Sequence, residues 1–194
     1  AAAVGYVMQA ARGLEYAHRK NIIHRDIKPD NIMLNDEGVA KVADLGLAKD
    51  VKDQEGSLTM AGIGMGTPHY MSPEQATDAK NCDGRADIYS LGCTLYQMIT
   101  GRVPYDGGSA YEIITKHVQE PMTPAHTVVA GLPEGLSAII ERMTAKKKEE
   151  HYANMAEVIA ALEQYLGVSY AAKGFQPGEE QIAALRAHAD DVEK

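Results

Sequence analysis

Residues 24–31 read His24-Arg25-Asp26-Ile27-Lys28-Pro29-Asp30-Asn31 and gather two acids, two cations and one amide within eight positions. Pro29 restricts the backbone of this stretch, and apolar residues on both sides, at 22–23 and 32–34, tie it to a core. Carboxylate and amide oxygens can bind a metal ion, and cationic side chains can bind phosphate groups. Residues of these types on a loop that a rigid scaffold holds are typical of a functional site. We therefore take this loop as the candidate functional centre of the chain.

The segments on either side of this loop have clear periodicities. Upstream, apolar residues at helical spacing predict a helix over about 2–20. Downstream, apolar runs at 32–34 and 39–42 flank the turn-forming residues 35–38 and predict a small β-hairpin. Because a hairpin brings its two ends together, Asn31 and Asp44 are expected to face each other across a gap that suits a metal ion. One carboxylate and one amide oxygen, completed by substrate phosphates, form a ligand set that Mg²⁺ favours.

The rest of the chain is predicted to be mostly helical. Residues 47–73 show no sustained period and predict a long loop of the kind that is usually functional. Four apolar stripes at helical spacing follow at 88–99, 113–118, 136–143 and 155–166, and Gly167 is expected to cap the last one. Residues 179–190 fit a short, weakly amphipathic helix. The predicted fold class is mainly α, a helical bundle with one small β-hairpin.

The composition excludes several classes of protein. The 194 residues are 45% hydrophobic and 24% charged, as in an ordinary globular protein. The formal net charge of −8 offers no basic footprint for nucleic acid, and no apolar run is long enough to span a bilayer. Cys82 and Cys93 match neither a Cys-x-x-Cys pair nor a zinc site. We expect reduced thiols, a cytoplasmic location, and neither nucleic acid nor a membrane as a partner.

Five motifs in series resemble those of protein kinases. Residues 24–31 fit the H-R-D-x-x-x-x-N catalytic loop with all spacings intact, and Asp44-Leu45-Gly46 resembles the D-F-G motif with Leu for Phe. Residues 66–74 resemble the end of an activation segment, 87–92 the central helix of the large lobe, and 100–105 the loop that leaves that helix. The sequence of residues 66–75 is similar to the corresponding segment of bacterial, eukaryotic-like serine/threonine kinases.

The resemblance implies a domain organisation. It assigns residues 1–166 to the C-terminal lobe of a protein kinase domain, with the activation segment at 44–74 and a helical subdomain at 84–166. Residues 167–194 lie beyond the resemblance and are expected to form an acidic tail or linker.

The resemblance also implies a role for each polar residue of the centre. Asp26 would orient the substrate hydroxyl and accept its proton, and Lys28 would neutralise charge on the γ-phosphoryl group of ATP. Asn31 and Asp44 would hold Mg²⁺ against the ATP phosphates. ATP and Mg²⁺ are thus the expected cofactors, and proteins with Ser or Thr hydroxyls the expected substrates. The alternative is a polar loop that only caps a hairpin. It requires that the five motifs match the family by chance.

Regulation of the centre is implied by Arg25. In kinases with this Arg beside the catalytic Asp, a phosphate on the activation segment pairs with the guanidinium and orders the segment. Thr59 is preferred to Ser57 for that phosphate because Thr67 belongs to the peptide-binding loop. An uncommitted surface hydroxyl stays an equal alternative for Thr59.

Five further residues would support the centre structurally. Asp87 would hold the backbone of the catalytic loop. His24 would form hydrogen bonds to backbone groups and pack on Leu45 rather than act as a base. The supporting residues are His24, Leu45, Gly46, Glu74 and Asp87.

The sequence departs from the family upstream of the catalytic loop. It contains no glycine-rich phosphate loop, strand Lys or helix Glu there. We therefore expect a small lobe in the same polypeptide, and the 194-residue chain alone to be inactive. The face around Ile22, Ile23, Met33 and Leu45 would then be partly exposed and promote self-association.

The second departure is at His151, which stands where the family has an Arg that pairs with Glu74. Loss of one partner of a buried ion pair costs about 3–5 kcal/mol. The Glu74 anchor is expected to be weakened unless a protonated His151 or a nearby Lys replaces the Arg.

Two functions of different classes follow. The first is a serine/threonine protein kinase, which the joint presence of Asp26, Lys28, Asn31 and Asp44 favours. The alternative is a non-catalytic pseudokinase or scaffold lobe that binds proteins, which the altered partner of Glu74 favours.

Overall fold

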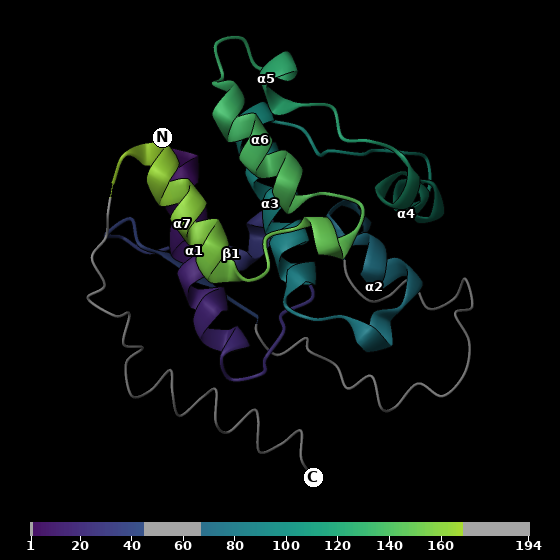
Figure 1. The fold of residues 1–194 in the computed structure, drawn as a ribbon, viewed down its shortest axis with the longest axis horizontal. Helices are drawn as coiled ribbons and strands as arrows, with labels where there is room; N and C mark the ends of the chain where they lie inside the picture. Colours follow the sequence, from purple (N-terminus) through teal and green to yellow (C-terminus); the bar gives the residue numbers. More distant parts are fainter. Residues whose placement is uncertain (1, 45–66, 169–194) are drawn as a thin grey trace.

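The computed structural model describes residues 2–44 and 67–168 (Figure 1). These residues are mainly helical, as the sequence predicts. The longer helices are α1 (Ala2–His18), α3 (Arg85–Thr100), α4 (Ala110–Gln119), α6 (Glu134–Met143) and α7 (Met155–Leu166). The shorter helices are α2 (Pro73–Thr77) and α5 (Ala125–Val128), and the single 3₁₀ turns are η1 (Pro29–Asn31), η4 (Pro68–Tyr70), η5 (Ala79–Asn81) and η6 (Lys148–Glu150).

The predicted hairpin is present. Its strands β1 (Ile32–Leu34) and β2 (Ala40–Val42) are antiparallel, with Ile32 opposite Val42. The side chain of Asn35 closes the turn, because its Oδ1 accepts the backbone N–H groups of Glu37 and Val39. The turn chemistry of 35–38 therefore sets the register that places residue 31 next to residue 43.

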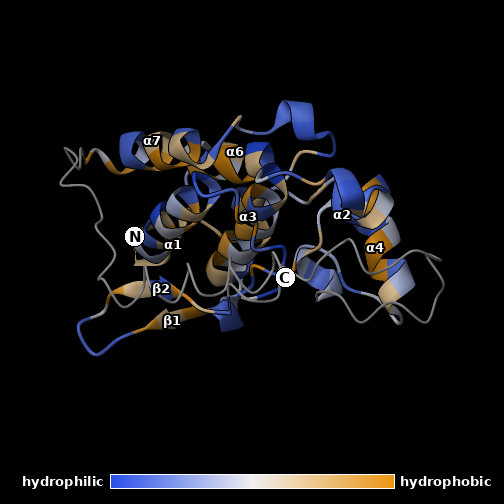
Figure 2. Ribbon diagram, turned by 90° about the horizontal axis from the view of Figure 1, so that it is seen from below, coloured by the Kyte–Doolittle hydropathy of each residue, from blue (hydrophilic) through white to orange (hydrophobic). Residues whose placement is uncertain are grey.

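Helix α3 is the centre of the core. All its residues from Ala86 to Tyr96 are buried, as expected of a helix that other elements cover on every side. Helix α6 approaches closely at Gly92, where an added Cβ would lie 2.7 Å from Thr144 Cγ2 and 2.8 Å from Met143 Cβ. Helix α1 packs on α3, α7 and β2. Figure 2 shows the resulting layers, with α6 and α7 on one side of α1 and α3 and the hairpin on the other.

The structure corrects two boundaries. Helix α1 ends at His18 rather than at residue 20, and Asn21 takes a left-handed φ of 59°. The loop predicted for 47–73 contains η4 and the first residue of α2 in its part beyond residue 66. Such one-turn elements are too short to show a period. Gly167 caps α7 with a left-handed φ of 65°, as predicted, whereas the expectation for 179–190 lies outside the described residues.

The hairpin exposes apolar side chains beside loop 24–31, which we call the catalytic loop after the motif that it resembles. Met33 and Leu34 are 61% and 51% exposed, and Ile22 and Ile23 are partly buried. Leu45 lies outside the described residues, and self-association through this face stays a prediction. Among the residues that the structure describes, no helix combines the length and the apolar character needed to span a membrane.

A buried polar contact joins α3 to α4. The hydroxyl of Tyr89 lies 2.8 Å from Nδ1 of His117, and both side chains are fully buried. Burial, and secondarily the charge of Lys146, lowers the pKa of His117 from 6.5 to about 3. The imidazole is therefore neutral in the folded chain at any pH between these two values.

Acidification is expected to destabilise the chain through His117. Since the unfolded state takes up a proton near pH 6.5 and the folded state only near pH 3, stability falls as the pH drops through this window. Between about pH 7 and about pH 4.5 the loss from this residue is about 2–3 kcal/mol. Urea unfolding at both pH values should show a smaller difference for His117→Gln than for the wild type. His69→Gln is the control at a partly exposed histidine, and equal pH dependence in all three proteins would contradict the assignment.

Candidate active site

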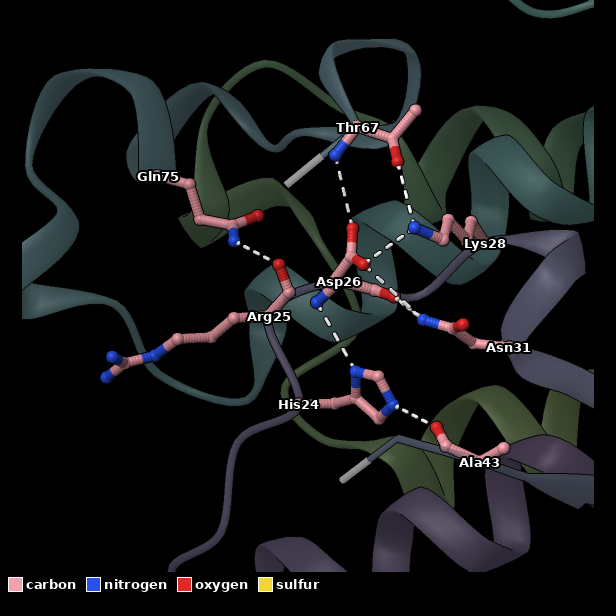
Figure 3. Close-up of polar contacts among 8 residues, drawn as sticks. All are labelled: His24, Arg25, Asp26, Lys28, Asn31, Ala43, Thr67 and Gln75. Atoms are coloured by element: carbon pink, nitrogen blue, oxygen red, sulfur yellow. Dashed lines mark hydrogen bonds and ion pairs between the residues drawn. The ribbon is translucent and has the colours of Figure 1, made fainter. Parts of the chain in front are cut away.

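Asp26 lies at the centre of the catalytic loop, and its carboxylate is held from three sides (Figure 3). Oδ2 accepts a hydrogen bond from Lys28 Nζ at 2.9 Å, and Oδ1 accepts the N–H of Thr67 at 3.2 Å. Lys28 Nζ also donates to the Thr67 hydroxyl oxygen at 3.1 Å. The side chain of Asp26 is only 11% exposed. A carboxylate so oriented can receive a proton or align a hydroxyl group.

Asn31, which directly precedes strand β1, also contacts Asp26. Its Nδ2 donates to the Asp26 carbonyl oxygen at 2.7 Å and lies 3.4 Å from Asp26 Oδ2. Since the amide nitrogen faces these oxygens, Oδ1 is the atom of Asn31 that is left for a metal ion.

Asp44 follows Ala43, the residue that the hairpin brings next to Asn31. The N–H of Ala43 donates to the Asn31 carbonyl oxygen at 2.9 Å, and the side chain of Asp44 is exposed. These oxygen donors fit Mg²⁺, which uses one or two protein ligands together with phosphates and water. Within the described residues no cluster of three or more His, Cys, Asp or Glu side chains could hold a metal ion.

The backbone of the loop is held from α3 by Asp87, whose side chain is fully buried. Its Oδ2 accepts the N–H of His24 at 2.9 Å, and its Oδ1 accepts the N–H of Arg25 at 2.8 Å. His18, at the end of α1, donates from Nε2 to Oδ2 at 2.7 Å. Asp87 thus joins α1, α3 and the catalytic loop.

His24 is buried and uses both ring nitrogens on backbone groups. Nε2 donates to the Ala43 carbonyl oxygen at 2.8 Å, and Nδ1 accepts the N–H of Asp26 at 3.3 Å. This pattern corresponds to the neutral tautomer with the proton on Nε2. The imidazole is engaged in structure, and neither nitrogen is available to a substrate.

Arg25 adopts a left-handed φ of 66°. Figure 3 shows its side chain directed away from Asp26, and its buried Nε has no hydrogen-bond partner. A guanidinium N–H without a partner is suited to receive an anion such as a phosphate. The hydroxyls considered for that phosphate, Ser57 and Thr59, lie outside the described residues, as do Leu45 and Gly46.

Glu74 forms no ion pair among the described residues, and His151 does not take the place of the expected Arg partner. Both carboxylate oxygens of Glu74 are buried without a hydrogen-bond partner. His151 Nε2 donates to the Ala145 carbonyl oxygen at 2.7 Å, while its Nδ1 has no partner. Among the residues described, no Lys forms an ion pair with Glu74 either. Neither replacement considered from the sequence is therefore present.

Two contacts of the centre were not anticipated from the sequence. Gln75 donates to the Arg25 carbonyl oxygen at 2.8 Å, and His18 binds Asp87. The run Ser72-Pro73-Glu74-Gln75 has the form of a capping box and would have predicted the start of α2. Nothing in the sequence indicates that Gln75 or His18 reaches the catalytic loop.

Comparison with known proteins identifies the family of the chain. The family model of the protein kinase domain matches residues 1–164. The probable serine/threonine-protein kinase PknB of Bifidobacterium longum is 43% identical over 166 residues, which cover 84% of this chain and 24% of that protein. Serine/threonine-protein kinase PknB of Mycobacterium tuberculosis is 38% identical over 160 residues, 82% of this chain and 25% of that protein.

The chain spans about a quarter of the length of these relatives. Its helical bundle and single described hairpin correspond to the large, C-terminal lobe of a kinase domain. The chain therefore belongs to the protein kinase family and is of the bacterial, eukaryotic-like serine/threonine type.

Proposed function

We propose that the protein containing this chain transfers the γ-phosphoryl group of ATP to Ser or Thr hydroxyls of proteins, with Mg²⁺. The observation that carries the proposal is the carboxylate of Asp26, which Lys28 and Thr67 hold in one orientation. Catalysis of phosphoryl transfer consists almost entirely of positioning and charge stabilisation. The contacts around Asp26 would position the acceptor hydroxyl and supply the positive charge of Lys28.

In the reaction, Asp26 aligns the acceptor hydroxyl and takes its proton as the new oxygen–phosphorus bond forms and the bond to the β-phosphate breaks. The ammonium of Lys28, 2.9 Å from Asp26 Oδ2, would stabilise negative charge on the transferred group. Asn31 Oδ1 and the Asp44 carboxylate would hold Mg²⁺, which neutralises phosphate charge when it is bound. Arg25 would receive a regulatory phosphate, with Thr59 as the preferred acceptor.

The test of this function is phosphate transfer by the full-length protein to a Ser/Thr-containing protein substrate. We expect transfer to require Mg²⁺ and to fall by at least about 10²-fold in Asp44→Asn, because the variant loses a charged metal ligand. Part of the loss should be recovered by raising the Mg²⁺ concentration. Asp36→Asn, at an exposed position of the hairpin turn, is the matched control. Undiminished transfer by Asp44→Asn would refute the proposed metal role.

A non-catalytic scaffold lobe is the second candidate, and the unpaired carboxylate of Glu74 favours it. A scaffold retains its protein partners in Asp26→Asn and shows no phosphate transfer in the wild type. An enzyme shows transfer in the wild type that Asp26→Asn abolishes. The inactivity of the 194-residue chain by itself and a cytoplasmic location stay predictions.

A further inference from the structure

Gln75 contacts the catalytic loop from outside its motif. Its Nε2 donates to the Arg25 carbonyl oxygen at 2.8 Å (Figure 3). On the other side, its Oε1 accepts the N–H of Ser72 at 3.1 Å, and its own N–H donates to Ser72 Oγ at 3.2 Å. The capping box fixes the orientation of the amide, because only the oxygen can accept from an N–H and only the nitrogen can donate to a carbonyl. The Gln75 amide therefore links the first turn of α2 to the catalytic loop.

The carbonyl that Gln75 holds belongs to the same peptide group as the N–H of Asp26. That N–H donates to His24 Nδ1 at 3.3 Å. Because a peptide group is planar, contacts at both ends set the orientation of the plane. This plane in turn sets the direction in which the side chain of Asp26 leaves the backbone.

The backbone at this point needs such support. Arg25 has a φ of 66°, and the left-handed conformation costs a residue with a Cβ about 1–2 kcal/mol. A conformation of this kind persists where the surroundings determine it. Asp87 holds the N–H of Arg25 at 2.8 Å, and Gln75 holds its carbonyl oxygen.

The segment 67–77 thus reaches Asp26 at two places. Thr67 donates its N–H to the carboxylate of Asp26, and Gln75 holds the preceding peptide group. We propose that Gln75 is a positioning residue, which orients Asp26 through the Arg25 carbonyl and so couples the placement of segment 67–77 to catalysis. This inference rests on the proposed function of phosphate transfer.

Two substitutions separate the bond to Arg25 from the cap of α2. Gln75→Glu keeps an acceptor oxygen for the Ser72 N–H but cannot donate to the carbonyl when it is ionised. Ser72→Ala removes the hydroxyl acceptor of the cap and leaves the Gln75 amide intact. Gln75→Met, which has a similar length and no amide, serves as a second variant if Gln75→Glu fails to fold.

The first readout is steady-state phosphate transfer by the full-length protein, at a temperature where melting curves show each variant to be folded. We expect Gln75→Glu to lower kcat by about 10- to 100-fold, since a small misplacement of a catalytic group has effects of this size. KM for ATP should change by less than about twofold. Ser72→Ala should keep kcat within about threefold of the wild type even if its melting temperature is lower. Equal losses of kcat in both variants, or an unchanged kcat in Gln75→Glu, would overturn the proposal.

The second readout is amide hydrogen exchange in the 194-residue chain, which does not depend on activity. We expect exchange at Arg25 and Asp26 to accelerate by at least about 10-fold in Gln75→Glu and to stay near the wild-type rate in Ser72→Ala. Unchanged exchange in Gln75→Glu would overturn the positioning role. An inactive full-length wild type would refute the proposed function, and the exchange rates would still decide whether Gln75 holds the loop.

Discussion

Asp26→Asn in the full-length protein is expected to reduce phosphate transfer by about 10²- to 10⁴-fold, the range over which a positioned base contributes. The amide oxygen of the variant can still accept the N–H of Thr67, whereas the –NH2 group that replaces the second oxygen cannot accept from Lys28. The backbone of the loop stays bound to Asp87 and Gln75 and should keep its conformation. The variant loses the ability to take the hydroxyl proton, together with the acceptor for the ammonium of Lys28. Single-turnover transfer from labelled ATP measures this step directly.

Asp36→Asn controls for the same chemical change at an exposed turn position. It should retain the wild-type rate. A melting curve of Asp26→Asn shows whether the variant is folded. Transfer by folded Asp26→Asn at a rate close to that of the wild type would contradict the assignment of the proton acceptor.

The second large effect concerns stability. Asp87→Ala is expected to lower the free energy of unfolding of the 194-residue chain by about 3–5 kcal/mol, because each buried donor left without an acceptor costs about 1–3 kcal/mol. The substitution leaves the N–H groups of His24 and Arg25 without acceptors, and His18 loses the carboxylate at 2.7 Å. Urea denaturation at neutral pH measures the loss.

Two comparisons sharpen this test. Asp87→Asn keeps one acceptor oxygen and should lose less stability than Asp87→Ala, because fewer buried groups are left without partners. Asp36→Ala, in the exposed turn, should change stability by less than about 0.5 kcal/mol. A loss of less than about 1 kcal/mol in Asp87→Ala would show that the loop does not depend on this carboxylate.

Apolar periodicity and turn-forming residues predicted most of the secondary structure, including the position of loop 24–31 between a helix and a hairpin. The helices longer than two turns follow from apolar periodicity, and the hairpin follows from the turn residues 35–38. The contact between residues 31 and 43 was predictable because a short hairpin brings its ends together. The one-turn elements η4 and α5 were missed since a single turn shows no period.

Contacts between distant segments could not be predicted in this way. Gln75 and Arg25 are 50 positions apart, and His18 and Asp87 are 69 positions apart. Whether two such side chains meet depends on helix packing and on the rotamers that the core allows. The same holds for His151, whose Nε2 binds a nearby backbone carbonyl rather than Glu74.

The sequence by itself determined the family and the chemistry that we propose, because the residue types and the spacing of 24–31 and 44 are local features of the chain. Only the tertiary structure decided how Asp26 is held. Its carboxylate and its backbone are positioned by Thr67, Gln75 and Asp87, which come from segments that folding alone brings to the loop. Residue type is a property of the chain, whereas orientation is a property of the packed core.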